Sequence, residues 1–266
     1  MDIPPLRPNA YSDGSLKQPR ISLWSLGGLG VWWPERDVQQ HPITDAEHAI
    51  ANHSCTVAGT SLWGAITGQR ASSTRTELAA GIAALLSSQA VHQATDSMSF
   101  KRKVDKILNG TKARRQKPWD LRRDGDLWQI RERLAQERGL HSVIITWVKG
   151  HATSQDVKDV RPTEVTKVAN DIADRLADLG VSEGHQIGLI RLAAHYAAKQ
   201  RKVVSISKTI HRIMLNVLKA EHDERVKRDK DALWVAALLH GPMHAHIEIP
   251  KTHKAPPYHE APPSQA

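Results

Sequence analysis

The sequence is short of cysteine and of long apolar runs. Its only cysteine among 266 residues is Cys55, which excludes an internal disulfide framework and a cysteine-based zinc site. No run reaches the roughly eighteen apolar residues of a transmembrane helix, so no membrane partner is expected. The first ten residues, MDIPPLRPNA, lack the basic and apolar segments of a secretory signal. These absences predict an intracellular protein, in the nucleus or the cytoplasm.

Positive charge is in excess and is unevenly distributed. The formal net charge is +9, and a basic protein of this size commonly binds a polyanion, although a merely basic surface is the alternative. Residues 101–123 contain ten bases and two acids, a net charge of +8. Residues 1–182 together carry only +4, so the remainder of that region is net acidic. Cations gathered in one element suit phosphate binding that weakens with salt.

Strand-like and helix-like patterns alternate along the first two thirds of the chain. Strands are expected at about Asn9–Tyr11, Leu29–Trp33, Thr60–Thr67, Val91–Thr95 and Ser142–Val148. Helices are expected at about Thr74–Ser87, Ser97–Leu108, Asp126–Glu137 and Thr163–Leu179. This order predicts a layered α/β domain with mixed strand directions.

Composition divides the chain into four segments. Residues 1–9 are proline-rich and predict an irregular lead-in, residues 10–182 form the α/β domain, and residues 183–240 predict a basic helical extension. Residues 241–266 are rich in proline and histidine and are expected to be disordered. In the extension, apolar side chains at helical spacing predict two amphipathic helices, which could pack on the domain or on each other, bind nucleic acid or recruit a partner. They are Leu189, Ile190, Ala193, Ala194 and Ala197, then Ile206, Ile210, Ile213, Met214 and Val217.

Four carboxylates lie at or near element ends. Asp13 is expected at the end of the first strand, Glu77 in the first turn of a helix, Asp96 at the end of a later strand and Asp174 within the last helix. Hard cations such as Mg²⁺ take oxygen ligands, and two such ions about 3.5–4 Å apart can assist phosphodiester cleavage. Acids converging from separate elements would form such a site.

Each acid also has an ordinary structural explanation. Asp13 could form a turn with the glycine after it. Glu77 could complete a capping box with Thr74. Asp96 could cap the helix that follows it, and Asp174 could be a solvated acid on a polar helix face.

The sequence motifs around these acids resemble those of type 1 ribonuclease H domains, in the same order, over about residues 10 to 180. They are Tyr11–Ser15 (Y-S-D-G-S), Thr74–Ala80 (T-R-T-E-L-A-A), Thr95–Ser97 (T-D-S), Trp147–His151 (W-V-K-G-H) and Asn170–Ala177 (N-D-I-A-D-R-L-A), with a weaker match at Asp126–Gln129. One such motif alone is not evidence of kinship, but five motifs in the order of the family make a chance match very improbable.

The resemblance implies a ribonuclease H-like fold, a five-stranded mixed sheet with helices on both faces. It implies that Asp13, Glu77, Asp96 and Asp174 bind two Mg²⁺ ions, or Mn²⁺, and that His151 assists catalysis. The implied activity is hydrolysis of the RNA strand of RNA–DNA hybrids, leaving 5′-phosphate and 3′-hydroxyl ends. A catalytically silent nucleic-acid-binding domain with the same fold is the alternative, and an integrase-like enzyme a third.

The basic segment lies where some family members carry a basic substrate handle. The expected nucleic-acid contacts are Lys101, Arg102, Lys103, Lys106, Arg114, Arg115, Lys117, Trp119 and Asn170. Trp119 could lie against the hybrid backbone or simply pack the handle.

Two segments depart from the family pattern. Residues 16–20 (L-K-Q-P-R) replace a glycine-rich turn, and residues 72–74 (S-S-T) stand where cellular enzymes often have asparagine. In the family these positions touch the 2′-hydroxyls that distinguish RNA from DNA. The departures and the helical extension resemble a retroelement domain, for which a reverse transcriptase would be the partner.

Overall fold

The computed structural model describes residues 3–67, 71–110, 117–152 and 164–240. The chain divides into two units, residues 1–204 and residues 205–266. The expected tail at 241–266 lies outside the described residues, as do Arg114 and Arg115.

The first unit is built on a mixed sheet with strand order β3-β4-β2-β1-β5-β6. Antiparallel pairing joins β1 to β2, β2 to β4 and β3 to β4, whereas β1–β5 and β5–β6 are parallel pairs. The strands are β1 (Ala10–Lys17), β2 (Leu26–Trp33), β3 (Asn52–Thr56), β4 (Gly59–Ile66), β5 (Val91–Thr95) and β6 (Val143–Trp147). The expected mixed α/β architecture is confirmed.

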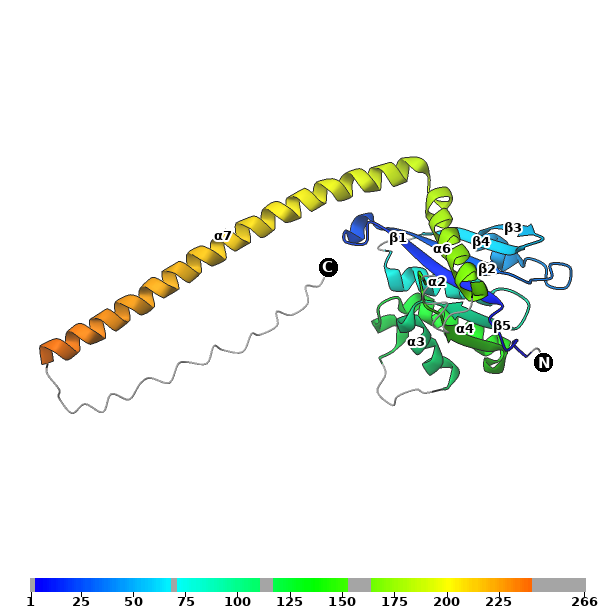
Figure 1. The fold of residues 1–266 in the computed structure, drawn as a ribbon, viewed down its shortest axis with the longest axis horizontal. Coiled ribbons are helices and arrows are strands. Elements are labelled where there is room, and N and C mark those ends of the chain that lie inside the picture. Colours follow the sequence, from blue (N-terminus) through cyan, green and yellow to red (C-terminus); the bar gives the residue numbers. More distant parts are fainter. Residues whose placement is uncertain (1–2, 68–70, 111–116, 153–163, 241–266) are drawn as a thin grey trace. The chain divides into compact units, whose positions relative to one another are not determined.

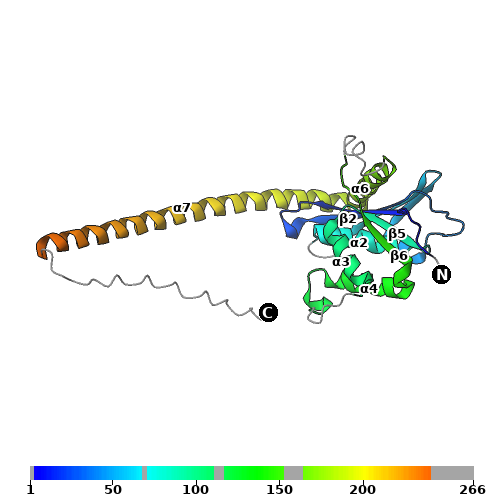
Figure 2. The same cartoon turned by 60° about the horizontal axis from the view of Figure 1, so that its bottom comes forward.

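Helices cover both faces of the sheet (Figures 1 and 2). On one face lie α2 (Ser73–Leu85), α3 (Met98–Leu108) and α4 (Gly125–Arg138), and on the other lies α6 (Glu164–Gly184). The shorter helices are α1 (Asp45–Ile50) and three 3₁₀ turns, η1 (Ser22–Trp24), η2 (Trp119–Leu121) and η3 (Leu140–Ser142).

The alternation of side chains along β2 explains the two layers. Leu29, Val31 and Trp33 are buried in the cluster that includes Leu85 of α2. The intervening Gly30 faces α6, where an added Cβ would lie 2.3 Å from the Ala177 nitrogen. Small residues at this point let α6 lie directly on β1 and β2. This close packing brings Asp174 of α6 toward the sheet.

Two strand predictions require correction. The sheet has six strands rather than five, because β3 pairs with β4 although all five of its side chains are exposed. β1 continues to Lys17 instead of ending near Tyr11, since Ser12–Lys17 pairs with Leu26–Val31 of β2. Asp13 therefore lies within a strand.

The C-terminal extension forms one helix, α7 (Ile187–His240), rather than two. Neither glycine nor proline occurs between Leu189 and His240, so no residue in that stretch favours a break. Within the first unit, Ala193 and Ala197 are buried and the Tyr196 ring stacks on Trp24 at 4.9 Å between centroids. In the second unit the described side chains are exposed. Within the described residues, no helix is long and apolar enough to span a membrane.

Candidate metal centre

Three of the predicted acids meet in the structure. Asp13 from β1, Glu77 from α2 and Asp96 just after β5 each offer a carboxylate oxygen, and these oxygens all lie within 4.8 Å of one another. The parallel pairing of β1 with β5 brings Asp13 and Asp96 to neighbouring strands, and α2 packs against β1. We call these three residues the acid triad.

The triad residues do not serve as turn or cap residues. Asp13 is paired across the sheet with Gly30. The cap of α2 is Ser72, which accepts from the Arg75 amide, so Glu77 lies in the second turn and forms no capping box. The cap of α3 is Ser97 rather than Asp96. The ordinary explanations for these three carboxylates are therefore wrong.

Close backbone packing fixes the positions of Glu77 and Asp96. A Cβ added at Gly14 would lie 2.4 Å from the Glu77 nitrogen, so only glycine lets β1 approach α2 this closely. A Cβ at Gly150 would lie 2.2 Å from Asp96 Oδ2. The Trp147 indole donates to the Asp96 carbonyl at 2.9 Å. The family motifs in the sequence include Gly14, Trp147 and Gly150, but the sequence alone did not indicate a role for these three residues.

Burial and mutual repulsion oppose ionisation of the triad. Burial, followed by the charge of Asp96, raises the pKa of Asp13 to about 7. Burial and the charges of Asp13 and Asp96 raise the pKa of Glu77 well above its ordinary value. Burial also raises the pKa of Asp96, helped by Asp174 and opposed by the positive charge of His151. A cation among these groups would favour their ionised forms.

The donor set fits a hard divalent cation. All three ligands are carboxylates, which Mg²⁺ prefers, and they come from separate elements. Glu77 Oε2 is buried and has no hydrogen-bond partner in the part of the chain that the structure describes. A buried polar atom without a partner is costly, and a bound cation would satisfy it.

Asp174 acts on the triad from α6, the helix that also carries Asn170. They are four residues apart and therefore share one helix face. Asp174 lies outside the compact group of three, yet its charge raises the pKa of both Asp13 and Asp96. Asn170 is buried, and no described residue forms a hydrogen bond with its Oδ1. His151 is exposed on the loop after β6, with a left-handed φ of 47°.

The predicted basic contacts divide into different environments. Arg102, Lys106 and Lys117 are exposed, whereas Lys101 pairs with Asp105 at 2.6 Å. The Lys103 ammonium lies 4.0 Å from the centroid of the Trp128 ring.

Trp119 packs inside the basic segment, residues 101–123. Its ring stacks on Trp128 with centroids 6.0 Å apart, and its indole donates to Glu132 at 2.6 Å. These contacts favour the packing role over a contact with the hybrid backbone.

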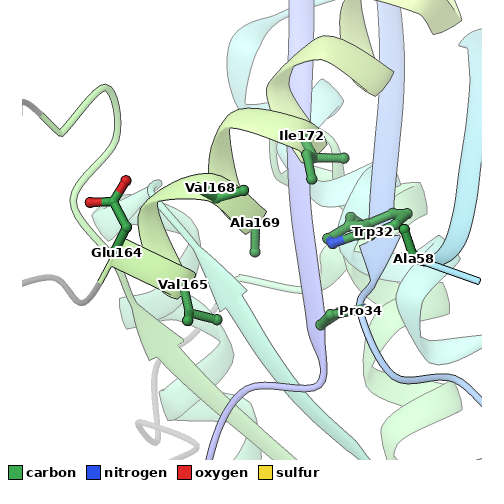
Figure 3. A pocket seen from close by; sticks show the side chains of 8 residues that line it. All are labelled: Trp32, Pro34, Ala58, Glu164, Val165, Val168, Ala169 and Ile172. Atoms are coloured by element: carbon green, nitrogen blue, oxygen red, sulfur yellow. The ribbon is translucent and has the colours of Figure 1, made fainter.

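A separate apolar pocket of about 390 Å³ lies between α6 and the β2–β4 side of the sheet (Figure 3). None of the acid triad lines it. Its lining residues are Trp32, Pro34, Ala58, Glu164, Val165, Val168, Ala169 and Ile172.

Comparison with solved structures found chains of low identity. The ribonuclease H domain of prototype foamy virus is 20% identical, with a TM-score of 0.41, and the match covers 65% of this chain and 92% of that one. A type 1 enzyme, LC9-RNase H1, is 20% identical with a TM-score of 0.40, covering 71% and 78%. RNase H1 of Halobacterium salinarum is 21% identical with a TM-score of 0.34, covering 65% and 96%.

No curated protein matches the chain. The family model for RNase H matches residues 9–182, which is more than half of the chain and includes the acid triad, Asp174 and His151. The prediction of family from the sequence is confirmed, and the chain belongs to the RNase H family.

Proposed function

We propose that this protein hydrolyses the RNA strand of RNA–DNA hybrids, with two Mg²⁺ ions, or Mn²⁺, held by Asp13, Glu77, Asp96 and Asp174. The observation that carries the proposal is the acid triad, in which Glu77 Oε2 is buried without a hydrogen-bond partner among the described residues. When bound, the ions would lower the pKa of the attacking water and stabilise charge on the scissile phosphate.

The chain's own residues would position the reaction and move its protons. Water attack breaks the bond between phosphorus and the 3′ oxygen, so the water loses a proton and the 3′ oxygen gains one. The products are a 5′-phosphate and a 3′-hydroxyl. His151 is exposed on the loop after β6, and its interaction with Asp96 lowers the pKa of that carboxyl. We assign it proton transfer or product release.

Asn170 and the handle would hold the substrate. We assign Asn170, which shares a face of α6 with Asp174, to the RNA strand, whose 2′-hydroxyls can hydrogen-bond with a side-chain amide. The exposed Arg102, Lys106 and Lys117 would contact phosphates, together with Lys101, Lys103, Arg114 and Arg115. If the domain derives from a retroelement, a reverse transcriptase would be its partner.

A catalytically silent binding domain is the second candidate. The altered turn after β1 favours it, since Gln18 stands there with a left-handed φ of 57° where the family has a glycine-rich segment. The intact triad argues against it, because binding alone does not require three carboxylates from separate elements that repel one another.

A substrate panel tests the proposal. The full chain is incubated with end-labelled RNA–DNA hybrid, single-stranded RNA, duplex RNA and duplex DNA, each with Mg²⁺ and with EDTA. Cleavage confined to the RNA strand of the hybrid, dependent on Mg²⁺ and leaving 5′-phosphates, supports the proposal. Tight binding of the hybrid without cleavage would contradict it and support the silent domain.

A further inference from the structure

The part of α7 that belongs to the second unit, from residue 205 onward, presents an apolar stripe of exposed side chains. Ile206, Ile210, Ile213 and Val217 are separated by four, three and four residues, and their exposed fractions are between 51% and 62%. This alternation is the heptad spacing that places side chains along one seam of a coiled coil. The stripe is independent of the nuclease site.

The same spacing continues through a charged centre to a second apolar block. The next seam positions are Ala220, Glu224, Lys227 and Asp231, followed by Trp234 and Leu238. Trp234 and Leu238 are exposed by 67% and 62%. The seam is therefore apolar at both ends and charged in the middle.

This pattern is complementary to itself in the antiparallel direction. In a pair of antiparallel copies centred between residues 225 and 226, Ile213 faces Leu238 and Val217 faces Trp234, each contact occurring twice by symmetry. At the centre, Glu224 of each copy faces Lys227 of the other. The large apolar residues then meet one another, opposite charges meet at the axis, and the small Ala220 faces Asp231.

The residues beside the seam agree with this register. In antiparallel pairs, positions on the same flank face each other. That places Glu221 opposite Arg228 and Asp223 opposite Lys230, while Met214 faces Val235. Each of these charged pairs is attractive.

A parallel pair is disfavoured by the same residues. It would place Glu224 against Glu224, Lys227 against Lys227 and Asp231 against Asp231 in the seam. Like charges facing one another at close range are repulsive. The order of charges along the seam therefore favours a second copy of this helix as the partner, in the antiparallel orientation.

We propose that residues 213–238 of α7 pair with the same segment of a second copy of this chain, as an antiparallel two-helix coiled coil. Sedimentation equilibrium of the full chain should then give twice the 29.5 kDa chain mass. A single-chain mass at every concentration, including micromolar protein, would overturn the proposal and leave the stripe to another partner.

Charge reversal tests the seam. Glu224→Lys and Lys227→Glu should each abolish the dimer, because each creates four like charges at the axis. An equimolar mixture of the two should restore it as a heterodimer. Asp229→Lys and Lys219→Glu, which reverse charges away from the seam, serve as matched controls and should remain dimeric. Dimers that persist in both seam variants would contradict the register.

Cysteine cross-linking tests the direction. In a Cys55→Ser background, Ala220→Cys chains mixed with Asp231→Cys chains should form a mixed disulfide on mild oxidation, since these positions face each other in the proposed register. Each variant alone should remain uncross-linked. Cross-linking of each variant with itself would indicate a parallel pair and overturn the proposal.

Discussion

At the scale of single residues, the central feature is a group of carboxylates that the fold holds together against their repulsion. The pKa of Asp13 is about 7 in the folded chain against 3.8 ordinarily. Between these values the folded state binds more protons than the unfolded state. In the metal-free protein, Asp13 therefore lowers the free energy of unfolding progressively as the pH rises from about 4 to about 7. Above about pH 7 this destabilisation is complete.

We predict that Asp13→Asn stabilises the metal-free protein at pH 8. A shift of about three pKa units corresponds to at most ~4 kcal/mol, which the neutral amide would relieve. Thermal melts with EDTA and with Mg²⁺ measure the effect. The native protein should melt higher with Mg²⁺, whereas the variant should not respond.

Asp178→Asn is the control with the opposite electrostatics. Although partial burial opposes its ionisation, hydrogen bonds from Lys17 and Ser15 hold the pKa of Asp178 below its ordinary value. Its replacement should not stabilise the metal-free protein and should leave the Mg²⁺ response intact. A metal-free Asp13→Asn protein less stable than the native chain would contradict the account.

Gly150 provides a second residue-scale prediction. A Cβ there would lie 2.2 Å from Asp96 Oδ2, so Gly150→Ala must displace that carboxylate. Displacing a ligand's support commonly costs about 10- to 100-fold in activity, which initial rates of hybrid cleavage would show. Gly188→Ala, where nothing lies within 4 Å of the added Cβ, is the matched control and should retain full activity.

Sequence reasoning identified the four acids but not their spacing. The sequence motifs indicated which carboxylates belong to the candidate site. The distances depend on the register of β1 against β5, where Tyr11 pairs with Ala94, and on the approach of Gly14 to α2. Such contacts join residues far apart in the chain, so local patterns do not report them.

At the scale of elements, strongly periodic segments were predicted well and sparse ones were not. The β5 prediction, Val91–Thr95, matches the structure at both ends. β3 was missed because its five residues, N-H-S-C-T, are all exposed and form a strand only by pairing with β4. The words around Asp13 favoured a turn, yet pairing with β2 keeps this segment extended.

The basic helix α3 carries the element-scale prediction. Arg102→Ala and Lys106→Ala remove exposed cations from it and should weaken hybrid binding. If each contacts one phosphate, the slope of log affinity against log salt should decrease by about 1 per substitution. Binding titrations at several salt concentrations measure the slope. Arg133→Ala, on α4, is the control, and an unchanged slope in the α3 variants would exclude the handle as the phosphate-binding element.

At the scale of the whole molecule, the start of α7 belongs structurally to the nuclease unit. Ala193 and Ala197 are buried, Tyr196 stacks on Trp24, and Arg201 donates to the Gln18 side chain at 2.6 Å. The last of these contacts holds the side chain of Gln18, in the altered turn after β1.

We predict that a chain ending at residue 204 retains the melting temperature and the cleavage rate of the first unit, whereas one ending at residue 184 melts lower. Loss of the aromatic stack alone costs about 0.5–1.5 kcal/mol, and 1 kcal/mol corresponds to about 2–4 °C in a unit of this size. Differential scanning calorimetry of both truncations measures the difference. Equal melting temperatures would contradict a structural role for residues 185–204.

The measurement that tests the central claim most directly compares hybrid cleavage by the native chain, Asp96→Asn and Asp178→Asn under single-turnover conditions with Mg²⁺. Removing a proposed metal ligand should cost more than the roughly 100-fold loss typical of a supporting residue. The account predicts such a loss in Asp96→Asn, with hybrid binding retained, and native rates in Asp178→Asn. Cleavage by Asp96→Asn at the native rate would contradict the assignment of the acid triad as the catalytic metal site.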